Sequence, residues 1–393
     1  MLHLKSIALA AVSAFALAAC ASPGSDAPAS EAAAGDAGFL ISGTDGSSVR
    51  AVALETFENP WAMTFLPDGR ALVTEKGGVI WLLDANGKKA GKVTGGPDVE
   101  ARGQGGLGDI ILHPEFATTG QIYLSYAERD ADNDELSGAA VEIARLTLSE
   151  TGGALSERSV LWRQFESVEG NGHYGHRLAV SPDRFLLISS GERQKFTPAQ
   201  DMGSTLGKVI RLNLDGSVPA DNPFAAQGGP AAEVWTLGHR NPLGLAFAAD
   251  GKLWLHEMGP RHGDELNLIV RGQNYGYPEV SNGNHYDGRD IPDHPTRPEF
   301  AAPAAFWVPA ISPAGLDIYE GALFPAWAGN ALIGGLSSKA LVRVAIAADG
   351  KAAEAARYEW GKRVREVEEG PDGAVYVLED KEDARLLRLT PPQ

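Results

Sequence analysis

The stretch WAMTFLPDGRALVTEKGGVIWLL, residues 61–83, contains three short apolar runs that are separated by two turns. The first turn is Pro67-Asp68-Gly69, and these residue types favour β-turns because proline fixes φ and glycine permits a positive φ. Short apolar runs between such turns are typical of β-strands. The stretch therefore predicts a small antiparallel sheet.

The same unit recurs along the chain. Equivalent turns stand at His113-Pro114-Glu115, Ser181-Pro182-Asp183, Ala249-Asp250-Gly251, Phe324-Pro325-Ala326 and Pro371-Asp372-Gly373. With the first copy these make six units, spaced roughly 45 to 75 residues apart, which is near the length of a propeller blade once loop insertions are allowed. We therefore predict an all-β fold for residues 49–393, a six-bladed β-propeller with four-stranded antiparallel blades. The alternative, two β-sandwich domains, would need a linker in the middle of the chain, and none is visible between Asn59 and Pro391.

Composition supports many short elements. The chain has 47 glycines and 24 prolines among 393 residues, which excludes a bundle of long helices. It carries 34 lysines and arginines against 51 aspartates and glutamates, and this net charge of −17 argues against a nucleic-acid partner. The single cysteine, Cys20, excludes an internal disulfide and a cysteine-based metal cluster, so any redox chemistry would need a bound cofactor.

The N-terminus has the features of a secretion signal. Residues 1–20 combine a cationic start with an apolar run that is too short to cross a bilayer. The ending Leu17-Ala18-Ala19-Cys20 resembles a bacterial lipobox, which predicts lipidation of Cys20 and a periplasmic protein whose only membrane contact is this lipid anchor. Ala21 favours the outer membrane. The alternative is an ordinary signal peptide cut near an A-x-A site. Residues 21–48 are rich in Ala, Ser, Gly and Pro and are expected to form a flexible tether.

The uneven spacing of the units places inserted loops around residues 129–140, 193–205 and 277–308, where a ligand site is expected. One polar segment, Arg102–Gly108, is rich in glycine, so its backbone can approach a ligand and direct Gln104 toward it. No helix pattern or Lys-Ser/Thr pair follows, which excludes a phosphate-binding loop. A tight turn between blades is the alternative interpretation.

A second segment, Asn171–Leu178, lies directly before a predicted strand and contains His173 and His176. A histidine at a strand entrance suits a general base because its pKa lies near working pH. Glu192, at the end of the next strand, could hydrogen-bond this histidine, or could be a solvated carboxylate. The two histidines could instead bind a metal, although no third ligand stands nearby in the sequence.

Two further segments contain charged residues in loops. Arg240, just before a proline-fixed strand start, offers a planar donor set for a carboxylate or a developing oxyanion, or else a plain ion pair. The segments His256–Glu265 and Gln273–Pro278 combine carboxylates with Gly and Pro carbonyls. Such oxygen ligands suit calcium better than zinc or copper.

Taken together, these segments resemble the glucose/sorbosone dehydrogenase family of soluble quinoproteins. The motifs that carry the resemblance are Gly-Gln-Gly-Gly-Leu (103–107), Gly-His-Arg-Asn-Pro (238–242), His-Glu-Met-Gly-Pro with the following Asp-Glu (256–265) and Asn-Tyr-Gly-Tyr-Pro (274–278). The resemblance covers essentially residues 55–390. It implies a six-bladed propeller that uses pyrroloquinoline quinone (PQQ) and calcium to oxidise aldose sugars at C1 to lactones and passes the electrons to a periplasmic acceptor.

The resemblance also implies roles for the reactive residues. His173 would take the proton from the anomeric hydroxyl while hydride passes to the quinone, and Glu192 would support this histidine. Gln104 would hydrogen-bond the cofactor or the substrate. Arg240 and Asn241 would contact the quinone oxygens.

Other matching positions would hold the cofactor and calcium. The carbonyls of Gly259 and Pro260 would bind the calcium that contacts PQQ, and Glu265 and Tyr275 would bind a further, structural calcium. Arg363 and Arg365 match a basic pair for the PQQ carboxylates.

One position departs from the family pattern. Relatives often carry a lysine in the fifth blade, where this chain has Ser337. Lys339, two residues along an expected strand, would point the same way and could substitute; otherwise PQQ affinity or catalysis would be reduced.

Two other functions fit parts of this pattern. One is a tethered propeller that binds a ligand without catalysis, and the other is a calcium-dependent propeller lactonase that needs no PQQ. The joint presence of His173, Arg240 and the basic pair favours the PQQ-dependent dehydrogenase.

Overall fold

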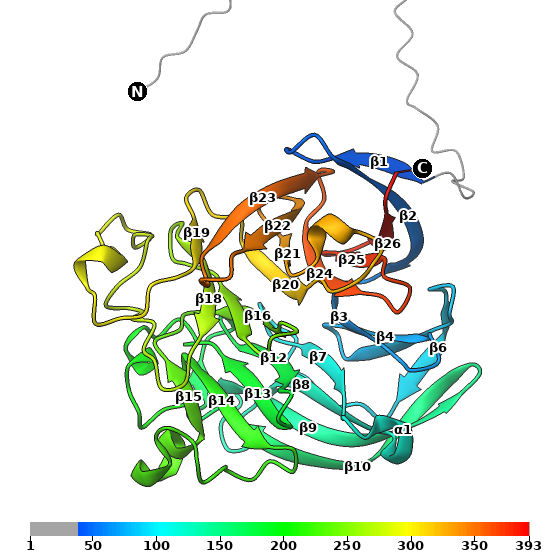
Figure 1. Ribbon diagram of the computed structural model, residues 1–393. Helices are drawn as coiled ribbons and strands as arrows, with labels where there is room; N and C mark the ends of the chain where they lie inside the picture. Colours follow the sequence, from blue (N-terminus) through cyan, green and yellow to red (C-terminus); the bar gives the residue numbers. More distant parts are fainter. Residues whose placement is uncertain (1–37, 393) are drawn as a thin grey trace, which may run out of the picture. The chain divides into compact units, whose positions relative to one another are not determined.

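The structure is a computed structural model that describes residues 38–392 (Figure 1). The predicted signal peptide, the lipidation site Cys20 and most of the predicted tether lie outside the described residues. Within residues 38–392 no helix is long and apolar enough to cross a membrane.

The strands form six antiparallel units around a ring, which we number as blades in chain order (Figure 1). Blade one comprises β3 (Pro60–Phe65), β4 (Ala71–Glu75), β5 (Val79–Leu83) and β6 (Lys89–Thr94). Blade two comprises β7 (Leu107–Leu112), β8 (Gln121–Arg129), β9 (Leu136–Ser149) and β10 (Gly152–Arg163), with β11 (Val168–Glu169) beside β9. Blade three comprises β12 (Gly175–Val180), β13 (Phe185–Ser190), β14 (Lys208–Asn213) and β15 (Val234–Leu237). Blade four comprises β16 (Pro242–Phe247), β17 (Leu253–Glu257), β18 (Asp264–Ile269) and β19 (Ala305–Trp307). Blade five comprises β20 (Pro313–Ile318), β21 (Ala331–Gly335), β22 (Ala340–Ile346) and β23 (Ala352–Glu359). Blade six comprises β24 (Val364–Glu369), β25 (Val375–Glu379) and β26 (Ala384–Thr390), and it is completed by β2 (Ser48–Phe57) and β1 (Phe39–Ser42).

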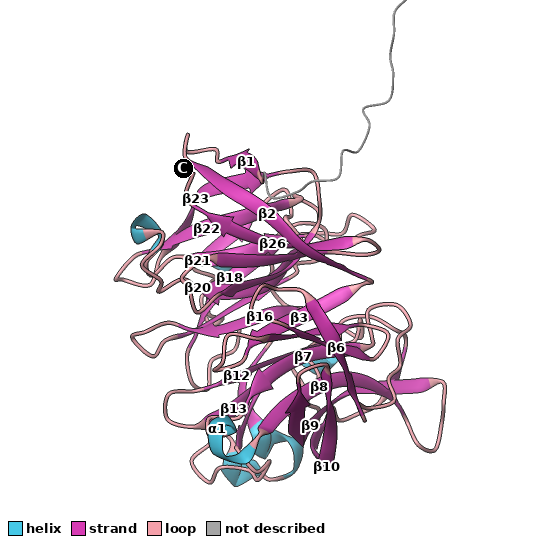
Figure 2. Cartoon of the chain, turned by 90° about the vertical axis from the view of Figure 1, so that its right-hand side faces the viewer, coloured by secondary structure: helices cyan, strands magenta, loops and turns pink. Residues whose placement is uncertain are grey.

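Helical segments are few and short, and they lie in the loops (Figure 2). They are α1 (Phe116–Thr119) and the 3₁₀ turns Thr197–Ala199, Ala225–Gln227, Gly229–Glu233, His294–Thr296 and Pro325–Trp327. The predicted all-β six-bladed propeller is therefore confirmed. Each of the six predicted turns joins the first strand of a blade to its second strand.

The ring closes through its inner strands and through its two ends. The first strand of each blade contacts the first strand of the next, and β24 contacts β3. In blade six, β2 pairs with β26, so the N-terminal and C-terminal strands share one sheet (Figure 1). A parallel contact between β6 and β10 also joins the outer edges of blades one and two.

The predicted boundary of the tether at residue 48 is wrong. Phe39–Ser42 form β1, which pairs with β2 in the sheet of blade six. Ile41 is buried in the same apolar cluster as Val49 and Leu389. These contacts stabilise the strand because they remove apolar side chains from water, and the folded unit therefore begins at Gly38.

Apolar side chains hold neighbouring blades together. Leu72 and Ile80 of blade one, for example, belong to the same buried cluster as Ile122 and Leu124 of blade two. Within each blade the first two strands are antiparallel, so the start of the first strand and the end of the second lie at the same edge. Six such edges meet at one end of the ring.

Candidate functional site

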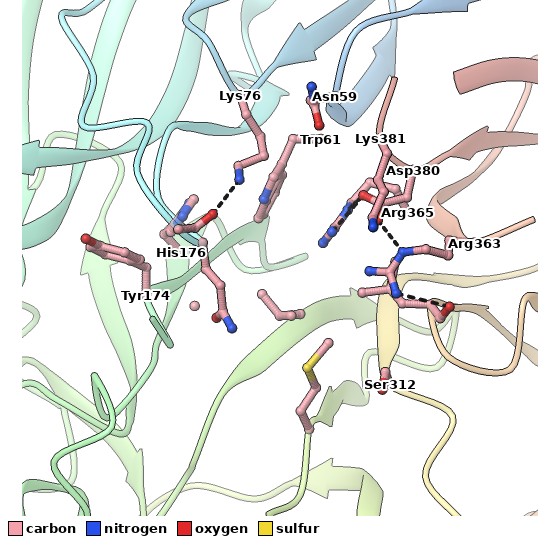
Figure 3. A pocket seen from close by; sticks show the side chains of 16 residues that line it. Asn59, Trp61, Lys76, Tyr174, His176, Ser312, Arg363, Arg365, Asp380 and Lys381 are labelled. Carbon is pink, nitrogen blue, oxygen red and sulfur yellow. Dashed lines mark hydrogen bonds and ion pairs between the residues drawn. The ribbon is translucent and has the colours of Figure 1, made fainter. Parts of the chain in front are cut away.

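A cavity of about 410 Å³ opens at this end of the ring (Figure 3). The residues that line it are Asn59, Trp61, Lys76, Gly103, Gln104, Tyr174, Gly175, His176, Leu243, Met258, Ser312, Leu336, Arg363, Arg365, Asp380 and Lys381. Each lies near the start of a first strand or just after a second strand. All six blades contribute, so the cavity exists only because the ring is closed.

Positive charge predominates on the side formed by blades one and six. Lys76, Arg363, Arg365 and Lys381 line the cavity there, together with the carboxylate of Asp380. Arg363 Nε and Arg365 Nε donate to the two oxygens of Asp380 at 2.6 and 2.9 Å (Figure 3). Burial alone would raise the pKa of Asp380, but the two guanidinium groups outweigh it and hold that pKa below its ordinary value. Four cations thus face one ionised carboxylate, which suits a ligand with several negative charges.

His173 and Glu192 form a buried pair at the edge of blade three. The Nδ1 atom of His173 lies 2.5 Å from Oε1 of Glu192, and Oε2 of Glu192 accepts the backbone N–H of Phe196 at 2.7 Å. Burial lowers the pKa of His173, although the hydrogen bond with Glu192 opposes this change. The imidazole is therefore neutral near pH 7, with Nδ1–H donating to the carboxylate and Nε2 available as a base.

Backbone contacts hold this histidine in place. Gln104 Oε1 accepts the backbone N–H of His173 at 2.9 Å, and the predicted Gln104 is itself among the residues that line the cavity. His173 has a φ of 51°, a conformation that side chains with a Cβ seldom adopt. The surrounding hydrogen bonds must therefore maintain it.

Arg193 supplies most of those bonds. Its buried guanidinium donates to the carbonyls of Gly170, Gly172 and Ser137 and stacks on Tyr174 at 3.8 Å. The backbone N–H of Arg193 donates to the backbone carbonyl of His173. Consecutive residues thus hold the histidine in two ways, since Glu192 binds the ring and Arg193 binds the loop that carries it.

His176 does not form a metal site with His173. Its ring stacks on Trp61 at 4.9 Å, its Nδ1 lies 3.0 Å from Ser125 Oγ, and burial lowers its pKa to about 3. Within residues 38–392 no group of three or more His, Cys, Asp or Glu side chains is arranged to bind a metal ion. His176 instead forms part of the cavity wall.

Arg240 and Asn241 lie next to the His173–Glu192 pair, and the backbone carbonyl of Arg240 accepts the backbone N–H of Glu192 at 2.8 Å. Arg240 Nη1 donates to the carbonyls of Met258 and Gly259 at 3.0 and 2.6 Å. In the described part of the chain, Arg240 Nε and Asn241 Oδ1 are buried without a hydrogen-bond partner. Because buried polar groups are costly when unpaired, this donor and this acceptor are available to a polar ligand.

The four residues predicted to bind calcium lie together. Gly259, Pro260, Glu265 and Tyr275 all line one small cavity beside Arg240. Burial raises the pKa of Glu265, and the neighbouring Glu257 adds to this effect. Glu265 also contacts His294 and Asn267, each at 3.3 Å. The donors here are oxygen atoms of a carboxylate and of backbone carbonyls, which is the chemistry that calcium prefers, although the carbonyl of Gly259 already accepts Arg240 Nη1.

The interpretation of Lys339 is wrong. Residues 336–339 form the turn between β21 and β22, and Lys339 has a φ of 54° in that turn. The alternation of a strand therefore does not apply, so Lys339 does not share a direction with Ser337. Both side chains are exposed and neither is among the residues that line the cavity.

Sequence reasoning missed Lys76, Lys381, Asp380 and Trp61. Lys76 comes directly after β4, as Met258 comes after β17 and Asp380 after β25. The available signal was position: once the six hairpins are aligned, the residue that follows each second strand reaches the same edge as Glu192.

Comparison with known proteins supports one family. The sequence profile of the glucose/sorbosone dehydrogenase family matches residues 57–388. Aldose sugar dehydrogenase YliI of Escherichia coli strain K12 is 36% identical over 348 residues, which cover 86% of this chain and 92% of that protein. The apo-form structure of the soluble aldose sugar dehydrogenase from Escherichia coli aligns with a TM-score of 0.82 and 34% identity, covering 88% of this chain and all of that one. The PQQ-bound aldose sugar dehydrogenase from Streptomyces coelicolor aligns with a TM-score of 0.70 and 27% identity, covering 89% and 98%.

Proposed function

Because the chain belongs to the glucose/sorbosone dehydrogenase family, we propose that it is a PQQ- and calcium-dependent dehydrogenase that oxidises aldose sugars at C1 to lactones. One observation carries the proposal: a cavity with four cations and one carboxylate is lined by Gln104, and Gln104 holds the backbone of His173, a neutral histidine oriented by a carboxylate. A redox cofactor with several carboxylates would bind to the cations, and a sugar hydroxyl would give its proton to the histidine.

The residues present fit PQQ. Arg363 and Arg365 have guanidinium groups that can pair with carboxylates, and Asp380 holds both in place. Arg240 Nε and Asn241 Oδ1 provide an unpaired donor and an unpaired acceptor near the reacting centre. When bound, PQQ supplies a centre that accepts two electrons with hydride, and calcium supplies a Lewis acid.

His173 provides the proton chemistry. Its neutral Nε2 would take the proton of the anomeric hydroxyl, and Glu192 would stabilise the imidazolium that forms, because the Nδ1–H bond to the carboxylate is already in place. Gln104 would hold its amide N–H toward the cavity, since its oxygen is occupied by His173. Arg240 would stabilise negative charge that develops next to it.

Calcium is a separate part of the proposal. The carbonyls of Gly259 and Pro260 would hold the ion beside the cofactor, and Glu265 and Tyr275 would hold a structural ion in the adjoining space. Their common small cavity and their oxygen donors support this assignment.

The cellular context is also proposed. A lipobox ending in Cys20 would anchor the protein to the outer membrane, with the propeller in the periplasm and electrons passing to a periplasmic acceptor. The family match and the homologue named aldose sugar dehydrogenase favour the oxidoreductase over the binding module and the lactonase.

The test uses purified protein to which PQQ and Ca²⁺ are added, with reduction of a dye followed for several aldoses. We expect reduction that depends on both PQQ and the sugar and is lost when EDTA is added before PQQ. A folded protein that reduces no dye at any PQQ concentration would rule the enzyme out.

A further inference from the structure

Lys76 occupies a position that family resemblance did not assign. It follows β4 of blade one, and its half-buried side chain reaches the cavity from a different blade than Arg363 and Arg365 (Figure 3). Burial lowers the pKa of Lys76, the positive charge of Arg365 lowers it further, and the negative charge of Asp380 opposes both effects. Lys76 and the basic pair therefore face one shared space.

The backbone of Lys76 is fixed on both sides. Its N–H donates to the carbonyl of Asn59, and its carbonyl accepts the N–H of Leu107, both at 3.0 Å. Gly106 has a φ of 117°, and a Cβ there would lie 2.3 Å from the carbonyl oxygen of Lys76, so only glycine permits this approach. The lysine therefore starts from an ordered base, which reduces the entropy lost when its side chain binds a ligand.

Among residues 38–392, the carboxylate whose charge acts on the ammonium group is Asp380, which Arg363 and Arg365 already share. Nζ donates to the carbonyl of Gly103 at 2.7 Å, and it makes no ion pair with a carboxylate (Figure 3). Two of the three remaining cations of the cavity already share Asp380. A half-buried ammonium group whose one hydrogen bond goes to a neutral carbonyl can still bind an anion that enters the cavity.

We propose that Lys76 binds a carboxylate of the cofactor. The inference rests on the proposed function, because PQQ is the ligand that brings several carboxylates to this cavity. Lys381 also lines the cavity but is exposed to solvent, and Lys339 lies in a turn outside it. Lys76 is partly buried, as Arg363 and Arg365 are.

The test measures binding and not turnover. Equilibrium dialysis with Ca²⁺ present gives the dissociation constant for PQQ in the wild type and in Lys76→Met, Lys76→Arg and the matched control Lys339→Met. Loss of a charge-assisted hydrogen bond should raise the constant about 10- to 100-fold in Lys76→Met. Lys76→Arg should recover most of the affinity, and Lys339→Met should bind as the wild type does.

A second ligand separates charge from loop structure. PQQ trimethyl ester lacks the carboxylate charges, so Lys76→Met should bind it as the wild type does. Equal weakening for PQQ and for the ester would mean that Lys76 only supports the Gly103 loop, and this result would overturn the inference. So would unchanged PQQ affinity in Lys76→Met. Wild-type protein that binds no PQQ would instead refute the proposed function itself.

Discussion

The two sides of the cavity use charge in opposite ways. On the reactive side, charged groups of blades three and four contact the lining residues Gln104 and Met258 and are matched: Glu192 pairs with His173, and Arg240 donates to the carbonyls of Met258 and Gly259. On the cationic side, formed by blades one and six, four cations line the cavity with a single carboxylate, Asp380, which pairs with Arg363 and Arg365. A site that moves a proton needs fixed protonation states, whereas a site that holds an anion needs charge left unpaired. The comparison therefore assigns turnover to one side and cofactor affinity to the other.

The strongest test of this division is His173→Ala. Removing the base should lower kcat about 10²- to 10⁴-fold, because general-base assistance is lost. The dissociation constant for PQQ should not change, since no cation has been removed. Dye-reduction kinetics at saturating PQQ, together with equilibrium dialysis, give both values. A large loss of PQQ affinity with normal turnover would reverse the assignment of the two sides.

Glu192→Gln tests how the base is tuned. We expect kcat to fall about 100-fold, because the imidazolium loses its carboxylate partner. Burial already holds the pKa of His173 below the ordinary value of about 6.5, and Glu192 opposes that effect. A base works only when it is deprotonated, so the wild-type rate should fall when the pH drops below the lowered pKa of His173. Without Glu192 the pKa should fall further, and the acid limb of kcat/KM should move to lower pH. Movement to higher pH would contradict the proposed pairing.

Arg365→Met is the reciprocal change on the cationic side. The dissociation constant for PQQ should rise about 10- to 100-fold, while kcat at saturating PQQ stays near the wild-type value. The difference in affinity should shrink as NaCl is added, because salt screens the attraction between Arg365 and PQQ that only the wild type has. Dialysis at two salt concentrations checks this expectation. A fall in kcat that saturating PQQ does not restore would show that Arg365 belongs to the reactive machinery.

Arg193 tests whether the reactive side depends on backbone placement. Arg193→Lys cannot reproduce a guanidinium fork that donates to Gly170, Gly172 and Ser137, so kcat should fall about 10-fold with unchanged PQQ affinity. Arg193→Gln also removes a charge that lowers the pKa of His173, so only this variant should move the acid limb to higher pH. Identical pH profiles for the two variants would restrict Arg193 to a structural role.

The same division explains what the sequence revealed. The six turns were predictable because each is a local signal of three or four residues. His173, Glu192 and Arg240 stood in short motifs with recognisable chemistry. The closure of blade six was not predictable, since Arg50 pairs with Thr390 across nearly the whole chain and no local pattern encodes that contact.

Only the two arginines of the cationic side could be predicted from the sequence, for a related reason. Arg363 and Arg365 form a recognisable pair, but a lysine after a strand is common, and nothing near Lys76 in the sequence indicates an anion. Lys76 lines the same cavity as Arg363 and Arg365 only because ring closure brings blade one beside blade six. Lys339 was misread because the alternation of a strand was extended into a turn with positive φ.

The smallest effect is expected at the position that departs from the family. Ser337 is exposed, and its hydroxyl donates to the carbonyl of Ala310 at 3.2 Å, while its neighbour Leu336 lines the cavity. In Ser337→Lys the new ammonium would remain solvated, and a solvated ion pair should tighten PQQ binding at most about fivefold. The gain should be larger in the Lys76→Met background, because one PQQ carboxylate then lacks a cation. A 10- to 100-fold gain in the otherwise wild-type protein would mean, by the usual scale of charge-assisted bonds, that the cavity lacks a needed cation and that Lys76 does not supply it.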